Sequence, residues 1–212
     1  MRNIPTFTTE NGVASLTLEE IPYTQRSYIR IHDASQSEIF LKECCEFCKA
    51  AGAQHIFAAG HTALKNYPVS TKIVRMSRLR EGLPDTDAAL FPVQEKTMEQ
   101  WRDLYNLNMR NIPNSAYITQ RKAEELLQKG NAYFVHNNDL LLGVGIASGE
   151  MLDGIISLVP GRGKDVLLAL NHALSGERII VEVATANVRA VRLYQKLGFI
   201  VTDELSTWYK IV

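Results

Sequence analysis

Asn187 and Tyr194 are the side chains whose types and spacing best support chemistry in this sequence. They belong to the segment 187–199, which follows the apolar run 178–184. Together the two segments predict a strand, a sharp turn, a helix and a second strand. Asn187 and Tyr194 lie about two helical turns apart, so both side chains can face one cleft. This pairing indicates chemistry as well as packing.

Each of these residues also has a structural interpretation. Asn187 is a good N-cap, because its side-chain oxygen can accept a free backbone N–H of the first helical turn. Gly198 stands where a left-handed residue ends a helix. Tyr194 shares a helical face with Leu193 and Leu197, and so can be a core aromatic with its hydroxyl at the edge. Capping and ligand contact by Asn187 are compatible, so both roles stay open.

The elements that would position this helix form a mixed α/β pattern. Helices are expected at 97–109, capped by Thr97, and from Thr119 to Gly130. The segment Asn137–Asp139 is a hairpin signal between two apolar strands. The expected strands are 132–136, 140–146, 151–159, 179–183 and two near Ile200 and Trp208, with further helices at 165–174 and 187–197. This order predicts helices packed over a partly antiparallel sheet.

The second half of the chain resembles the GNAT N-acetyltransferase superfamily over roughly residues 91–212. The residues that carry the resemblance match the signature N-x-x-A-x-x-L-Y-x-x-x-G-F, and they are Asn187, Ala190, Leu193, Tyr194, Gly198 and Phe199. The resemblance implies a central mixed, mostly antiparallel sheet flanked by helices. It also implies acyl transfer from acetyl-CoA to an amine by direct attack in a ternary complex.

The resemblance assigns roles to three segments. Gly161–Lys164 would bind the donor's pyrophosphate with backbone N–H groups at a helix N-terminus and with two cations. Ser157–Val159 would bind the pantetheine arm, with a backbone N–H near Val159 as oxyanion donor. Tyr194 would protonate the departing thiolate as general acid, and Asn187 would bond the pantetheine or a bridging water. The cofactor-binding residues implied are Ser157, Leu158, Val159, Arg162, Gly163, Lys164, Asp165, Val166, Asn187 and Tyr194.

The phosphate-binding loop departs from the family's pattern R/Q-x-x-G-x-G. Asp165 and Leu167 stand where the last two glycines are expected. A carboxylate beside a pyrophosphate is repulsive unless it turns outward. A leucine could block close approach of the backbone to the phosphates. Both departures fall in the segment that the resemblance assigns to the pyrophosphate.

The general base is left open. Glu150, Asp153 and Glu182 lie near the strand ends that flank the family's cleft, and a water relay is an alternative. A lone carboxylate at a strand edge is usually solvated surface. His136, in a hairpin, is expected to be exposed.

The first half predicts a smaller α/β unit, with residues 1–88 and 89–212 as the two domains and residues 81–87 as the linker. Its elements are expected at 12–19, 27–32, 38–51, 55–59, 62–66 and 71–80. The order from Ser27 to Arg80 echoes the order from Met151 to the end. This echo indicates either a degenerate GNAT-like duplication or a shared α/β period. We interpret this unit as a scaffold or substrate-side wall, with His61 the one residue to watch.

Composition excludes several classes of protein. Among 212 residues, 46% are hydrophobic and 22% charged, which is typical of a globular protein. Lys plus Arg equals Asp plus Glu at 23 each, so no global field indicates nucleic-acid or membrane binding. No apolar stretch approaches a membrane span, and a cytoplasmic location is expected. Cys44, Cys45 and Cys48 lack further ligands at a metal-site spacing, and Cys44 and Cys48 are predicted to be core residues of one helix.

Two functions follow as hypotheses. The first is an acyl-CoA-dependent N-acetyltransferase with Tyr194 as acid, no metal and a small-molecule amine or peptide acceptor. The second is a catalytically weak or inactive GNAT-fold ligand-binding or regulatory protein, because of Asp165 and Leu167. The first unit as a homodimerisation platform is a third idea. Acceptor pockets are built from variable loops, so the sequence does not identify the acceptor.

Overall fold

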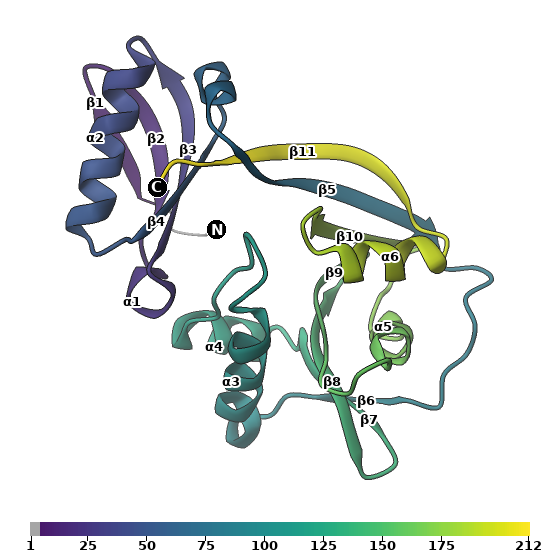
Figure 1. The fold of residues 1–212 in the computed structure, drawn as a ribbon. Helices are drawn as coiled ribbons and strands as arrows, with labels where there is room; N and C mark the ends of the chain where they lie inside the picture. The colour runs from purple at the N-terminus through teal and green to yellow at the C-terminus, as the bar shows by residue number, and fades with distance from the viewer. Residues whose placement is uncertain (1–4) are drawn as a thin grey trace. The chain divides into compact units, whose positions relative to one another are not determined.

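The computed structural model describes residues 5–212 and divides them into two compact units. Unit 1 comprises residues 5–73 with 204–212, and unit 2 comprises residues 74–203. The division falls inside two long strands, β5 (Val69–Leu79) and β11 (Ile200–Lys210), each of which runs through both units (Figure 1). It therefore differs from the predicted division at residues 88 and 89. The segment 81–87 is a loop inside unit 2, because β5 contributes its second half to the core of that unit.

Unit 1 is a sheet with one long helix packed on it. Its strand order is β1-β2-β3-β4-β11, and β3 and β4 are parallel while the other pairs are antiparallel. Helix α2 covers one face, where Phe40 and the three cysteines meet apolar residues of β2, β3 and β4. The elements besides β5 and β11 are β1 (Thr6–Thr9), β2 (Gly12–Thr17), α1 (Ile21–Thr24), β3 (Arg26–Ala34), α2 (Ser37–Ala50), β4 (His55–Ala59) and the 3-10 helix η1 (Thr62–Asn66).

Unit 2 contains strands in the order β5-β10-β9-β8-β7-β6. The hairpins β6–β7, β7–β8 and β8–β9 are antiparallel, whereas β9 and β10 are parallel and joined by a crossover helix. The elements are β6 (Ala89–Pro92), η2 (Glu95–Thr97), α3 (Met98–Met109), α4 (Gln120–Gln128), β7 (Ala132–Asn137), β8 (Leu140–Ser148), β9 (Met151–Ser157), α5 (Gly163–Asn171), β10 (Arg178–Ala184) and α6 (Val188–Lys196).

Two helix pairs cover opposite faces of the unit 2 sheet (Figure 1). Helices α3 and α4 bury Trp101, whose indole N–H donates to the carbonyl of Tyr133 at 3.1 Å. Helices α5 and α6 form the other cluster, in which residues 166–170 are all buried. Gly143 of β8 permits close packing of α5, because an added Cβ would lie 2.8 Å from the Val166 side chain. The buried helices hold the C-terminal ends of β9 and β10 in place.

The mixed fold class predicted from the sequence is confirmed. Three predictions about elements are wrong. Strand β11 is one continuous strand where two are predicted, and β1 and β6 are missed because each has four residues. Thr97 makes no cap hydrogen bond to α3; its hydroxyl instead donates to the carbonyl of Gln94 at 3.1 Å.

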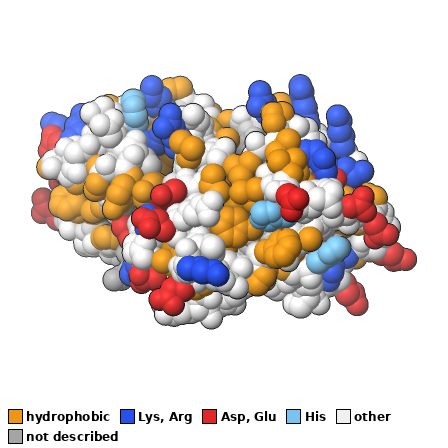
Figure 2. Space-filling model, turned by 90° about the horizontal axis from the view of Figure 1, so that it is seen from below, with side chains coloured by type: hydrophobic (Ala, Val, Ile, Leu, Met, Phe, Trp, Pro, Cys, Tyr) orange, Lys and Arg blue, Asp and Glu red, His pale blue; other side chains and the backbone are white. Residues whose placement is uncertain are grey.

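The surface mixes charges of both signs. On the face drawn in Figure 2, acidic and basic side chains both occur, with hydrophobic side chains between them. Across residues 5–212 no helix has the length and apolar character that crossing a bilayer requires. Hydrophobic side chains exposed by half or more include Tyr23, Val69, Leu79, Phe91, Leu107, Leu140, Ile200 and Val201.

Candidate functional site

Strands β9 and β10 separate after a very short parallel ladder. Only Met151 and Leu152 pair with β10, opposite Ile180 and Val181. On its other edge β9 pairs with β8 along its whole length, up to Ser157 opposite Gly143. The edge of β9 that faces β10 is thus outside this ladder from residue 153 onward. Two adjacent strands that part in this way open a wedge at their C-terminal ends.

The segment after β9 leaves one backbone donor free at this opening. The carbonyl of Val159 accepts from the Ser157 hydroxyl at 2.7 Å and from the N–H of Arg162 at 3.2 Å. Leu158 N–H donates to the carbonyl of Leu142 at 2.8 Å, which continues the β8–β9 ladder. Within residues 5–212, the N–H of Val159 donates to no acceptor. Val159 therefore retains a donor of the kind that binds a carbonyl oxygen.

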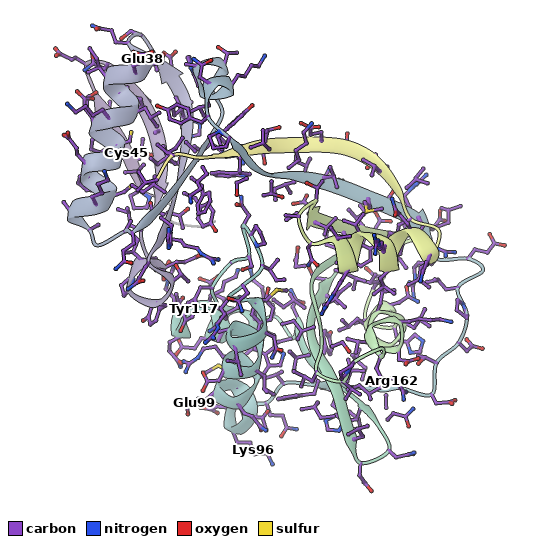
Figure 3. The ribbon with its side chains drawn as sticks, in the orientation of Figure 1. Glu38, Cys45, Lys96, Glu99, Tyr117 and Arg162 are labelled. Atoms are coloured by element: carbon purple, nitrogen blue, oxygen red, sulfur yellow. The ribbon has the colours of Figure 1, made fainter. Side chains whose placement is uncertain are left out.

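Helix α5 begins without a side-chain cap. Arg162 is its N-cap residue and makes no cap hydrogen bond, and the N–H groups of Gly163, Lys164 and Asp165 have no acceptor among the described residues. Free N–H groups and the helix dipole together make such an end attractive to anions. Arg162 lies at this end of α5 (Figure 3). The start of α5 thus has the donor set for an anionic group.

The Asp165 carboxylate is turned to the arginine of the same loop. Arg162 Nε and Asp165 Oδ2 are 2.5 Å apart, and both side chains are partly buried. Leu167 is fully buried in the core beneath α5, so its side chain lies away from the loop. Val166 is also fully buried, and its N–H donates to the carbonyl of Arg162 at 3.1 Å. The obstruction expected from Leu167 is therefore absent, whereas the charge of Asp165 remains beside the arginine.

Helix α6 has the ends that the sequence predicts. The Asn187 side chain accepts from the N–H of Ala190 at 3.3 Å, and Asn187 is half-buried. Gly198 has φ of +83°, and the N–H of Phe199 donates back to the carbonyl of Tyr194 at 3.0 Å. Both capping predictions are confirmed.

Tyr194 is a buried aromatic with an accessible hydroxyl. Its ring packs 5.6 Å from that of Phe199, and only 7% of the residue is exposed. Burial raises the pKa of the Tyr194 phenol to about 12. The hydroxyl makes no hydrogen bond to residues 5–212, and it is not fully shielded from solvent. The phenol is therefore held neutral and can meet a ligand.

The three acidic candidates have different surroundings. Glu182 forms an ion pair with Arg75, whose Nη2 lies 2.8 Å from Glu182 Oε1. Glu150 precedes β9 at the paired end of the wedge, where its Oε1 accepts from the N–H of Arg178 at 3.2 Å. Asp153 is exposed and directly follows the last residue of β9 that pairs with β10. Asp153 is thus the candidate carboxylate nearest along the chain to the point where the strands separate.

Two histidines flagged by the sequence lie outside this wedge. His136 is half-buried, with ring centroids 5.3 Å from Phe91 and 6.4 Å from Phe134. The expectation that it is exposed is wrong, because strand β6, which the sequence does not reveal, places Phe91 beside it. His61 lies in unit 1 and begins η1, with its Nδ1 accepting from the N–H of Ala63 at 3.3 Å.

The cysteines are confirmed as core residues. Cys44, Cys45 and Cys48 are free and buried in α2. Burial raises the pKa of the Cys44 thiol to about 12 and that of Cys45 to about 11. In the part of the chain that the structure describes, no group of three or more His, Cys, Asp or Glu side chains is arranged to hold a metal ion.

Sequence reasoning missed the two arginines at the end of β5. Arg80 donates to the carbonyl of Asn171, the last residue of α5, at 3.1 Å. It also donates to the carbonyls of Leu174 at 2.8 Å and Gly176 at 3.1 Å, which follow the helix. Arg78 donates to the carbonyl of Leu197 at the end of α6. Cations at helix C-termini are favoured by the dipole. No local signal could reveal these contacts, since each joins residues about 90 or more positions apart.

Comparison with known proteins identifies the fold. No family model matches the sequence, and no curated protein matches it significantly. Among solved structures, a GCN5-related N-acetyltransferase from Sphaerobacter thermophilus matches with a TM-score of 0.59 and 10% identity, over 93% of this chain and 75% of that one. The chain has the GNAT fold.

Two further structures match across almost the whole chain. A functionally unknown conserved protein from Staphylococcus epidermidis matches with a TM-score of 0.61 and 10% identity, over 99% of this chain and 94% of that one. A tandem GNAT protein from the clavulanic acid biosynthesis pathway matches with a TM-score of 0.52 and 12% identity, over 94% of this chain and 78% of that one. The likeness therefore includes unit 1, beyond the residues 91–212 that carry the resemblance in the sequence.

Proposed function

We propose that unit 2 is an acyltransferase domain that moves an acetyl group from acetyl-CoA to a primary amine. The observation that carries the proposal is the wedge between β9 and β10, with the free N–H of Val159 and the uncapped start of α5 beside it. A thioester with a long arm and a pyrophosphate needs an opening for the arm, a donor for its carbonyl and an anion site. The GNAT fold of the chain supports the same assignment.

The residues present fit this donor molecule, except for the carboxylate of Asp165. The pyrophosphate would meet the N–H groups of Gly163, Lys164 and Asp165 and the Lys164 ammonium, while Ser157 to Val159 and Asn187 would line the arm. Acetyl-CoA would supply the acetyl group activated as a thioester. The exception is the Asp165 carboxylate, which accepts from Arg162 Nε and adds a negative charge beside the phosphates, while the Nη groups of Arg162 remain able to donate to a phosphate oxygen.

The chemistry assigned to the chain is a direct transfer. The amine nitrogen forms a bond to the thioester carbonyl carbon, the Val159 N–H stabilises the charge on the carbonyl oxygen, and the carbon–sulfur bond breaks. Tyr194 gives its proton to the leaving sulfur and regains a proton from solvent, since burial favours its neutral phenol. The amine loses a proton to a carboxylate or to water. The carboxylates considered for this step are Glu150, Asp153 and Glu182.

The proposal is tested by following free thiol release from acetyl-CoA in the presence of a panel of primary amines and peptides. We expect release that depends on an amine, together with a product heavier by one acetyl group. Thiol release that never exceeds the rate without protein, across the panel and at saturating acetyl-CoA, would refute the enzyme assignment.

A second candidate function is favoured by one observation. The Asp165 carboxylate already occupies Arg162, so a form of the GNAT fold that binds a ligand without turnover would keep this ion pair. The two functions differ in one result: the second predicts acetyl-CoA binding, or binding of a related anion, with no amine-dependent thiol release.

A further inference from the structure

Unit 1 repeats the order of elements in the candidate site but closes the wedge. Its strands β3 and β4 are parallel and joined by α2, as β9 and β10 are joined by α5. The β3–β4 ladder has five consecutive pairs, from Arg26 opposite His55 to Arg30 opposite Ala59. Gly60 follows with φ of +99°, and a Cβ there would lie 2.2 Å from the carbonyl oxygen of Ile31. Strands β3 and β4 stay paired to the end of the ladder, so a pantetheine arm cannot pass between them.

A small cavity lies beyond the C-terminal ends of these strands instead. Its volume is about 120 Å³, which equals about four waters at the density of the liquid. In α/β sheets, ligands bind outside the carboxyl ends of parallel strands. The cavity is lined by residues of β3, α2, η1 and the turn before η1, and they are Ile31, Ser37, Glu38, Leu41, His61, Ala63, Leu64, Asn66 and Tyr67.

The lining has an apolar floor and a polar rim. Ile31, Leu41 and Leu64 are buried and belong to the core of unit 1. Glu38 is at the N-terminal end of α2 (Figure 3), and its side chain forms no ion pair or hydrogen bond with residues 5–212. Among the lining residues that the structure describes, Glu38 is the one with a carboxyl side chain, and none is Lys or Arg. A cavity of this composition favours a cation with a short apolar tail.

His61 also lines the cavity, and its hydrogen bond to Ala63 determines which ring nitrogen can donate. Since His61 Nδ1 accepts from the N–H of Ala63, the proton of a neutral His61 is on Nε2. Asn66 and Tyr67 also line the cavity, and their side chains carry oxygen acceptors. An ammonium group, which has three donors and no acceptor, matches a lining with a carboxylate and further oxygen acceptors.

We propose that this cavity binds a small primary alkylammonium ion, with the ammonium on Glu38 and the alkyl chain against Leu41 and Leu64. The site is separate from the candidate acyl-CoA site, and it does not depend on the proposed acetyl transfer. Its size excludes CoA and admits a chain of a few carbons.

The test is a titration of the full chain with n-butylammonium chloride, followed by amide chemical shifts in ¹H–¹⁵N spectra. We expect saturable shifts concentrated at residues 37–41 and 61–67. Sodium butyrate and n-butanol, which share the alkyl chain, should bind at least about fivefold more weakly, because they lack the charge that Glu38 attracts.

A variant at Glu38 and a control variant at an exposed carboxylate of the same helix complete the test. Glu38→Gln should weaken n-butylammonium binding by about fivefold, since it removes the charge of a carboxylate near the surface. Glu46→Gln, an exposed carboxylate on the same helix, should leave binding unchanged. Butyrate binding as tight as n-butylammonium, an unaltered Glu38→Gln variant, or no saturable shifts at the cavity would each overturn the proposal. The same spectra titrated with acetyl-CoA report on residues 157–166, so failure of one site is distinguishable from failure of the other.

Discussion

Tyr194 illustrates how one residue can serve packing and chemistry together. Its ring belongs to the buried face of α6, while its hydroxyl makes no hydrogen bond to residues 5–212 and is not fully shielded from solvent. Burial opposes the phenolate, which raises the pKa and preserves the acid form. The packing interpretation and the functional one therefore describe two ends of the same side chain.

The Tyr194→Phe variant tests the acid role directly. We expect kcat for acetyl transfer to fall by about a hundredfold or more, because a positioned general acid contributes on that scale. The melting temperature should change little, since the ring and its contact with Phe199 are kept. Tyr209→Phe, a half-buried tyrosine of unit 1, is the control. A variant that turns over like the unaltered protein would remove Tyr194 from the chemistry.

Alkaline pH should destabilise the protein through its buried acids. The pKa values of the Cys44 and Cys45 thiols are raised from 9.0 to about 12 and about 11, so the unfolded chain loses these protons first. Stability is then full below pH 9 and declines as pH rises toward 11, by about 1.4 kcal/mol per pH unit for each thiol. Urea unfolding under reducing conditions between pH 8 and pH 10.5 measures the decline. Cys44→Ala should make it shallower, and a flat profile for the unaltered protein would contradict this account.

At the scale of elements, the local signals of the sequence succeed where the cause is local. Strand β4 and helix η1 match their predicted bounds, and the caps of α4 and α6 form as expected. The sequence predicts β11 in two pieces because residues 200–205 have no apolar alternation. The wedge between β9 and β10 is a matter of register between distant strands, so no pattern within either strand encodes it.

Helix α5 is the element on which cofactor binding depends. Asp165→Asn removes a negative charge from its first turn and frees Arg162. We expect acetyl-CoA to bind about threefold to tenfold more tightly, because a charge beside the phosphates is lost and a cation is gained. Asp139→Asn in the β7–β8 hairpin is the control, and calorimetric titration gives the affinities. An unchanged affinity in Asp165→Asn would mean that the pyrophosphate lies elsewhere.

The C-terminal end of α5 offers a test of stability. Arg80→Ala removes a donor from each of the carbonyls of Asn171, Leu174 and Gly176, and should lower the free energy of unfolding by about 1–3 kcal/mol. Arg121→Ala removes an exposed ion pair, in which Arg121 Nη1 lies 3.4 Å from Glu125 Oε1. It should lower the free energy of unfolding by less than about 0.5 kcal/mol. Equal effects of the two substitutions in urea unfolding would show that Arg80 is dispensable.

For the whole molecule, the two units share an order of elements but differ in the opening that acyl-CoA needs. Five consecutive pairs join β3 to β4, and two join β9 to β10. The echo read in the sequence between residues 27–80 and 151–212 corresponds to this common strand, helix, strand order. The sequence could not reveal that the division lies within β5 and β11, because a strand shared by two units has no turn or linker residues to mark it.

The most direct measurement of this account is a calorimetric titration of the full chain with acetyl-CoA. We expect saturable heat with one molecule bound per chain, because β9 and β10 separate after two pairs whereas β3 and β4 stay paired over five. We also expect Lys164→Ala to weaken acetyl-CoA binding, because it removes a cationic ammonium group from the first turn of α5. The absence of heat at near-millimolar acetyl-CoA, or a stoichiometry of two, would contradict it.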